Sequence, residues 1–173
     1  MFIGREDKDR KRAYGFRLEV ARSVFKSDFF RGISIGVLAN NVGAFQGVQV
    51  GLLNFVQDLT CRMQDCYGIL IGGLNLVEKP MRSKYESKKS EAKLAQIGVL
   101  YNGLYWPYSK ERPSYALQLS LENEAGTEEK RALRTTQIGL VNILRGEARG
   151  IQIGLLNYRD FGVRLPIPGI RIS

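Results

Sequence analysis

The 173-residue sequence contains no histidine, only two cysteines and a single tryptophan. The missing histidine removes the commonest general base and the commonest metal ligand. Two cysteines cannot supply the usual four-ligand Cys/His zinc site. No apolar run approaches the ~18 residues that a transmembrane helix requires. We therefore expect a protein that is not an enzyme, that holds no metal or cofactor, and that has no membrane-spanning helix.

The two cysteines, Cys61 and Cys66, lie five residues apart in a segment typical of a turn between strands. If oxidised, they would close a small disulfide loop, which would place the protein outside a reducing cytosol. Two unpaired thiols fit the sequence equally well, so both states stay open.

Charge and glycine are what the chain has in excess. It carries 26 Lys+Arg against 17 Asp+Glu, which gives a net charge of +9. Glycine accounts for 19 of the 173 residues, a larger share than the average usage of roughly 7%. The positive charge favours an anionic partner, such as nucleic acid, a lipid head group or an acidic glycan. Because the cations are scattered among acids, a cationic soluble surface without a nucleic-acid role is the simpler interpretation. The glycine content indicates positions at which a side chain is excluded.

The charged residues cluster most densely at the start of the chain. Residues 1–13 are predicted to form a flexible charged arm, and they lack the apolar segment of a secretory leader. Residues 14–173 have the length of a single domain. A location at the cell surface or in the envelope would require a leader that this chain does not show, and the alternative is the cytoplasm.

One phrase recurs through the sequence. Residues 150–157 read GIQIGLLN and residues 47–54 read GVQVGLLN, with looser copies between them. We call the position of the second glycine in this phrase the glycine slot. Successive glycine slots are 15, 21, 26, 22, 19 and 15 residues apart, which fits a 15-residue unit enlarged by insertions. The seven slots hold Gly36, Gly51, Gly72, Gly98, Ser120, Gly139 and Gly154. Asparagines three residues past the slot are Asn54, Asn75, Asn123, Asn142 and Asn157.

The repeats predict an all-β protein, because the units alternate with period two and none shows a helical period. In the last unit, one strand face presents Ile151, Ile153 and Leu155 and ends in an asparagine, whereas the other face, with Gln152, is only half apolar. We favour a parallel β-solenoid of about 15–26-residue coils. In a parallel stack, identical positions of the repeat lie against one another in every coil, so the same sequence suits each coil. In such a fold the slot glycines and the asparagines would each form a column. The alternative is an antiparallel meander, as a sheet or a barrel.

Two units depart from the pattern, because Ala39 and Tyr101 occupy the asparagine position and Asn40 and Asn102 follow one residue later. The asparagine column should therefore break or shift there. At the C-terminus, two prolines within residues 164–172 predict an edge strand or a cap over an open end, since proline cannot donate to a sheet. Exposed terminal coils would also allow dimers.

The phrase Gly-x-Gln-Ile-Gly-Leu-x-Asn, spaced by about fifteen residues, resembles the surface-repeat proteins of leptospires and related bacteria. The end of the chain, YRDFG followed by a proline-containing apolar tail, is similar to the C-termini of that group. The resemblance spans residues 32–172. It implies a surface or envelope location and no defined activity.

One segment combines aromatic and cationic side chains that could stack sugars or nucleotide bases. Its residues are Tyr101, Tyr105, Trp106, Tyr108, Lys110 and Arg112. The alternative is that these aromatics cover the apolar end of a coil. A second group, Lys84, Lys88, Lys89 and Lys93, would lie on anionic lipid or glycan, or in a solvated loop.

Glu122 and Glu124 share one side of a predicted strand, but a solvated strand end is a simpler expectation than acid/base chemistry. We predict a non-enzymatic, surface-associated repeat scaffold that binds another macromolecule. The alternatives are a small envelope β-barrel in contact with lipid and a basic module for nucleic acid or anionic glycan.

Overall fold

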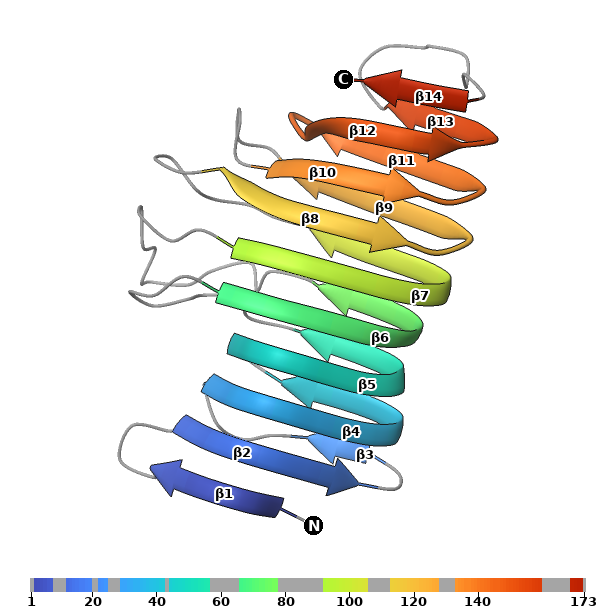
Figure 1. Ribbon diagram of the computed structural model, residues 1–173. Helices are drawn as coiled ribbons and strands as arrows, with labels where there is room; N and C mark the ends of the chain where they lie inside the picture. The colour runs from blue at the N-terminus through green and yellow to red at the C-terminus, as the bar shows by residue number, and fades with distance from the viewer. Residues whose placement is uncertain are drawn as a thin grey trace.

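In a computed structural model the chain folds into stacked β-coils (Figure 1). The structure describes residues 2–7, 12–19, 22–24, 29–42, 44–56, 66–77, 92–105, 113–127, 133–159 and 169–172, and among these it contains no helix. The strands are β1 (Phe2–Asp7), β2 (Arg12–Glu19), β3 (Arg22–Val24), β4 (Phe29–Val42), β5 (Ala44–Val56), β6 (Cys66–Val77), β7 (Ala92–Tyr105), β8 (Ser114–Leu119), β9 (Glu122–Thr127), β10 (Leu133–Ile138), β11 (Val141–Gly146), β12 (Arg149–Gly154), β13 (Leu156–Arg159) and β14 (Gly169–Ile172).

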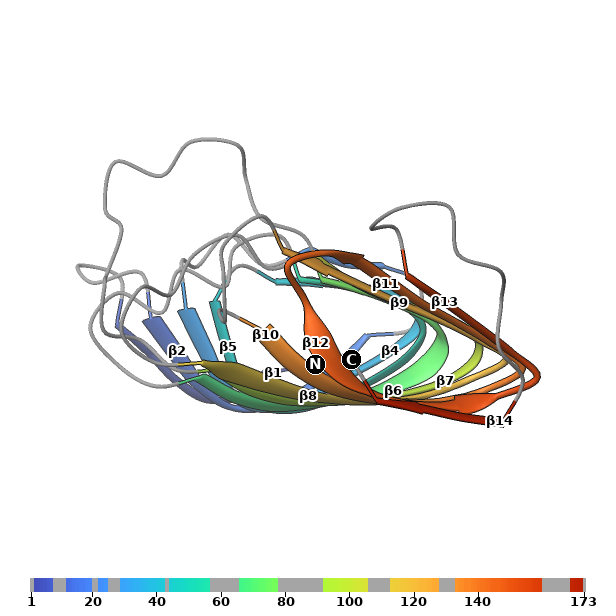
Figure 2. The ribbon, with the colours of Figure 1, turned by 90° about the horizontal axis from the view of Figure 1, so that it is seen from above.

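Each coil bends once and contributes to two layers, which Figure 2 shows from above. The front layer has the order β1-β2-β4-β5-β6-β7-β8-β10-β12-β14. The back layer contains β3, the second halves of β4 to β7, and then β9, β11 and β13. The long strands β4 to β7 run through the bend, whereas later coils are divided into two strands there.

All pairs between successive coils are parallel, from β2 to β12 in the front layer and from β3 to β13 in the back layer. The chain is therefore a parallel β-solenoid, with successive turns about 19 residues apart. The prediction of a solenoid is confirmed, and the antiparallel alternative is wrong.

The glycine slots lie in register at the bend. Gly36, Gly51, Gly72 and Gly98 are paired from coil to coil, and Gly154 continues the column at the other end. At Gly72, Gly139 and Gly154 the coil below is too close for a side chain. A Cβ on Gly72, for example, would lie 2.1 Å from the carbonyl oxygen of Gly51. The same Cβ would lie 2.6 Å from Asn54 Nδ2, so the slot glycine makes room for the asparagine amide.

The asparagines form a continuous ladder of side-chain amides between the two layers. Each Nδ2 donates to the Oδ1 of the next asparagine at 2.7–3.1 Å. The ladder comprises Asn54, Asn75, Asn102, Asn123, Asn142 and Asn157. Asn102 belongs to it because the register of β6 and β7 shifts at the bend and absorbs the extra residue. The same shift between β4 and β5 brings the backbone of Asn40 into register with that of Asn54.

Glutamines form a second ladder on the inner side of the front layer. Gln118, Gln137 and Gln152 each donate from Nε2 to the Oε1 of the preceding glutamine, at 2.8, 2.8 and 3.0 Å. Each of these Nε2 atoms also donates to a carbonyl of the back layer, as Gln118 does to Glu124 O at 3.0 Å. The glutamines therefore tie the two layers together as well as the coils.

The apolar core lies on the side of the coils away from the bend, where front strands begin and back strands end. It is small, and its members are Phe30, Val56, Leu70, Val77, Leu94, Leu104, Ala116, Ala125, Leu133, Leu144 and Ala148. The interior is thus apolar on one side and filled with amides near the bend. The ladders satisfy most of these amides, and an unsatisfied buried polar group is costly. Gln49 and the Oε1 atom of Gln152 have no hydrogen-bond partner among the described residues.

Both ends of the front layer are antiparallel. β14 lies antiparallel to β12, so residues 169–172 form the predicted edge. β1 pairs antiparallel with β2, which corrects the prediction that residues 1–13 form a flexible arm, since residues 2–7 form a strand. Phe2 and Ile3 continue the apolar pattern of β2 and give this segment a strand preference despite its charge. Arg17 and Arg171 occupy the glutamine column at its two ends, and both are buried.

Candidate interaction surface

The outer side of the front layer is apolar, although the inner side is lined by glutamines. Two columns of mostly aliphatic residues project outward on either side of the glutamine column. One column contains Phe16, Ile33, Val48, Ile69, Ala95, Leu117, Thr136, Ile151 and Ile172, and the other contains Leu18, Ile35, Val50, Ile71, Ile97, Leu119, Ile138, Ile153 and Ile170. We call this surface the front face.

Front-face isoleucines are exposed even in the middle of the sheet. Ile69, Ile97 and Ile153 are 40%, 43% and 38% exposed, whereas Gln96, Gln118 and Gln152 are 0% exposed. The bend beside them extends the apolar surface, with Leu52, Val99 and Leu155 exposed by 55–67%. A contiguous apolar patch of this extent usually marks an interaction site.

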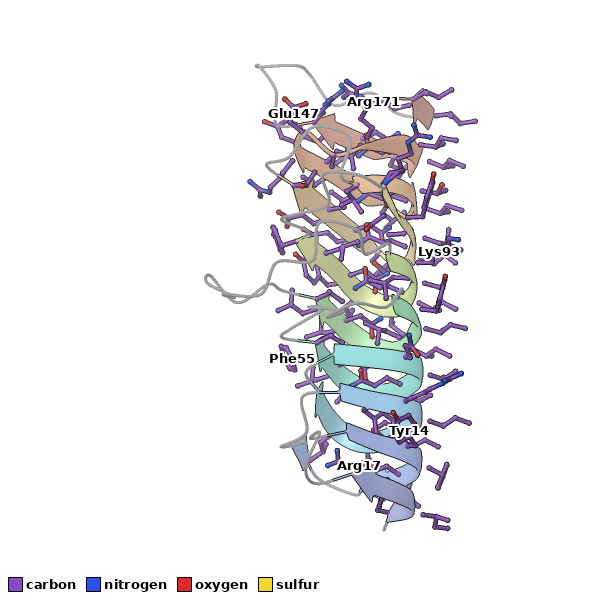
Figure 3. The ribbon with its side chains drawn as sticks, turned by 90° about the vertical axis from the view of Figure 1, so that its left-hand side faces the viewer. Tyr14, Arg17, Phe55, Lys93, Glu147 and Arg171 are labelled. Carbon is purple, nitrogen blue, oxygen red and sulfur yellow. The ribbon has the colours of Figure 1, made fainter. Side chains whose placement is uncertain are left out.

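A third outward column borders the front face on the side away from the bend, and it is aromatic and cationic. Its described side chains are Tyr14, Arg31, Gln46, Tyr67, Lys93, Tyr115, Arg134 and Arg149. Lys93 Nζ lies 5.6 Å from the centre of the Tyr67 ring. Tyr14 and Lys93 project from the same side of the molecule in Figure 3, opposite Phe55. We call this column the basic column.

Two shallow hollows mark the front face. One runs along the glycine slots and is lined by apolar side chains that include Ile35, Val50, Leu52, Ile71 and Val99. The other lies at the basic column, where Lys93, Tyr115 and Arg134 surround small residues such as Gly150.

The back layer carries one buried charge, Glu124, on its outer side. Tyr101 from the preceding coil donates its hydroxyl to Glu124 Oε2 at 3.0 Å. Arg145 from the following coil donates its Nε to Glu124 Oε1 and forms an ion pair with it. The Glu124 side chain is only 8% exposed, so the expectation of a solvated strand end is wrong for this residue. Gly103, which is paired with Glu124 on β7, and Gly126, two residues along β9 and paired with Tyr105, leave room for the tyrosine rings.

The environment of Glu124 changes three pKa values. Burial alone would raise the pKa of Glu124, but hydrogen bonds from Tyr105, Arg145 and Tyr101 outweigh burial and leave the pKa below its usual value. Burial, followed by hydrogen bonding to the other tyrosine, raises the pKa of Tyr101, and burial and the hydrogen bond to Glu124 raise that of Tyr105. Glu124 is therefore an ionised, internally paired carboxylate.

The lowered pKa of Glu124 predicts how the stability of a Glu124→Gln variant depends on pH. A carboxylate with a folded-state pKa below its unfolded value of about 4.3 stabilises the fold above that value and loses this contribution as pH falls through the folded pKa. We expect Glu124→Gln to cost about 1 kcal/mol near neutral pH, since Arg145 is half exposed, and progressively less in acid. Thermal unfolding from about pH 3 to 8 measures the difference, with Glu122→Gln as the control. A penalty independent of pH would contradict the ionised pairing.

The predicted aromatic and cationic segment is only partly placed. Tyr101 and Tyr105 lie together on the back layer and hold Glu124. Trp106, Tyr108, Lys110 and Arg112 lie outside the described residues, and so do the lysines Lys84, Lys88 and Lys89. Cys61 also lies outside them, so the choice between a disulfide with Cys66 and two free thiols stays open. Lys93 is described and belongs to the basic column, on the opposite side of the molecule from Glu124.

Sequence reasoning did not identify the front face, Arg145 or the burial of Glu124. For the front face, the alternation of Gln152 with Ile151 and Ile153 is visible in the repeated phrase, but it does not say which of the two sides is buried. For Glu124 no local signal exists, since its partners come from two other coils.

Comparison of the chain with protein-family models, with curated proteins and with solved structures finds no match. No helix among the described residues is long and apolar enough to cross a membrane. Those residues also include no group of three or more histidine, cysteine, aspartate or glutamate side chains placed to hold a metal ion.

Proposed function

We propose that the protein is a non-enzymatic repeat scaffold, located at the cell surface or in the envelope, that binds another macromolecule through its front face. The inverted arrangement of the front layer carries the proposal: glutamines are buried and isoleucines are exposed. Burying the isoleucines would stabilise a complex by about 25 cal/mol per Å² of apolar area, whereas their exposure gains nothing for the isolated chain.

The resemblance of the repeats to surface-repeat proteins supports the location. The surface between Tyr101, Tyr105 and Arg145 is a weaker candidate for a ligand site, because these side chains already contact Glu124. An anionic ligand there would have to displace the Glu124 carboxylate from Arg145.

Site-specific photo-crosslinking in the producing cells tests the proposal. A benzophenone amino acid replaces Leu117, which is exposed on the front face, or Ile143, which lies on the outer side of the back layer. We expect adducts, with protein or lipid, from position 117 and few from position 143. Equal yields at both positions, or no adduct at position 117, would show that the front face is not an interaction surface.

A further inference from the structure

We propose that the partner of the front face is the surface of an anionic phospholipid bilayer. This inference rests on the proposed function and names its partner by chemistry. Three features of the described residues support it: the order of side chains across the face, the absence of acidic side chains from it, and the pairing of its backbone.

The side chains change in character along each front strand. Exposed aliphatic residues at the bend, such as Leu52 and Val99, are followed by the isoleucine columns and then by the basic column. Tyrosine and arginine favour the region between lipid head groups and acyl chains, because each has an apolar body and a polar tip. The order therefore matches the depth profile of a bilayer, with the bend inserted deepest and the basic column at the head groups.

Charge on the front face has one sign. Arg31, Lys93, Arg134 and Arg149 are exposed in the basic column, and no acidic residue occupies the three outward columns among the described residues. Cations near a membrane surface bind anionic lipid. The hollow beside Lys93, Tyr115 and Arg134 offers a place for a phosphate, and the apolar hollow along the glycine slots offers a place for an acyl chain.

A second copy of this chain fits the face less well. In a two-fold pair with the faces together, the basic column would lie either against the basic column of the other copy or against its apolar bend. The first arrangement opposes like charges, and the second buries cations against aliphatic side chains without acidic partners. Nucleic acid fits less well too, since exposed isoleucines offer no stacking surface for bases.

The backbone of the front layer tolerates an apolar environment. Strands β2 to β12 each pair with a neighbour on both sides, so the interior of the sheet presents side chains alone to the partner. Unpaired backbone groups are the feature that lipid does not accept.

Vesicle flotation of the full chain tests the inference. We expect binding to phosphatidylcholine vesicles that contain about 30% phosphatidylglycerol, weak binding to pure phosphatidylcholine, and loss of binding at high salt. Arg134→Gln/Arg149→Gln should weaken binding at least about tenfold. The matched single changes are Arg149→Gln in the front layer and Arg159→Gln in the back layer, each of which removes one positive charge. Arg149→Gln should weaken binding, whereas Arg159→Gln should bind like the wild type.

The apolar columns are tested by Ile97→Thr/Ile138→Thr/Ile153→Thr, which keeps β-branched side chains in the strands as Thr136 does naturally. We expect this variant to lose binding even at low salt, whereas Ile143→Thr in the back layer should keep it. Circular dichroism checks that each variant is folded.

Several results would overturn the inference: no flotation with anionic vesicles, equal flotation of front-layer and back-layer variants, or binding that ignores lipid charge. Sedimentation without vesicles provides a further test. If the wild type is a dimer and the triple threonine variant is a monomer, the front face binds a second copy of the chain and not lipid. Protein adducts without lipid adducts at position 117 would refute the lipid partner and leave the proposed function standing. No adduct at all would refute both.

Discussion

Replacement of Gly139 by alanine is expected to destabilise the fold by about 2–4 kcal/mol, a large effect for a single methyl group. The added Cβ would lie 2.2 Å from the carbonyl oxygen of Ser120 and 2.6 Å from Asn123 Nδ2. Neither atom can retreat easily, because Ser120 belongs to the neighbouring coil and Asn123 Nδ2 donates to both Ile138 O and Asn142 Oδ1. Denaturant unfolding followed by circular dichroism measures the cost.

Gly126→Ala is the matched control for this substitution. Its added Cβ would meet Arg145 Cβ at 3.2 Å, a side-chain contact that a small shift relieves. We expect it to cost less than about 1 kcal/mol, because the reduced freedom of the unfolded chain that alanine brings offsets part of the cost of this contact. Equal stability of the two variants would refute the interpretation of the slot glycines as crowded stacking positions.

Substitution of two glutamines in the same column by leucine is expected to change stability in opposite directions. Gln118→Leu removes the donor to Gln96 Oε1 and Glu124 O and the acceptor of Gln137 Nε2. The broken ladder leaves buried polar atoms unsatisfied, at about 1–3 kcal/mol each where no other partner remains. We expect a total cost of about 2–4 kcal/mol.

Gln49→Leu should instead raise stability by about 1 kcal/mol. Gln49 is 0% exposed, and neither atom of its amide has a hydrogen-bond partner among the described residues. Its neighbour in the column is Leu70, so the glutamine ladder is interrupted there, and a leucine at position 49 would pack on another leucine. The two variants are compared by unfolding under identical conditions. A loss of stability in Gln49→Leu as large as that in Gln118→Leu would contradict the role of ladder pairing.

These two experiments address the same property of the fold, which is that amides fill much of the space between its layers. A stacked amide ladder satisfies donors and acceptors from coil to coil, as in cross-β structures. Such an interior needs few large apolar side chains. The isoleucines of the repeat are thereby available for the outer surface.

Much of the fold follows from the sequence alone. A directional phrase repeated at short intervals predicts parallel stacking, because only parallel neighbours place glycine on glycine and asparagine on asparagine. The slot glycine and the asparagine three residues later also follow from the phrase, and so does the edge strand at the C-terminus. These features are local or periodic, and a single chain displays them.

Only the tertiary structure decided which side of the front strands is buried. Glutamines and isoleucines alternate in the repeat, and either set could face inward. The hydrogen bonds of Gln118 and Gln137 to the glutamines of both neighbouring coils, and to carbonyls of the back layer, make the polar side the inner one. The structure likewise decided the strand β1, the shift that keeps Asn102 in the ladder, and the burial of Glu124 between Tyr101 and Arg145. Each of these depends on contacts between residues distant in the sequence, which no local pattern encodes.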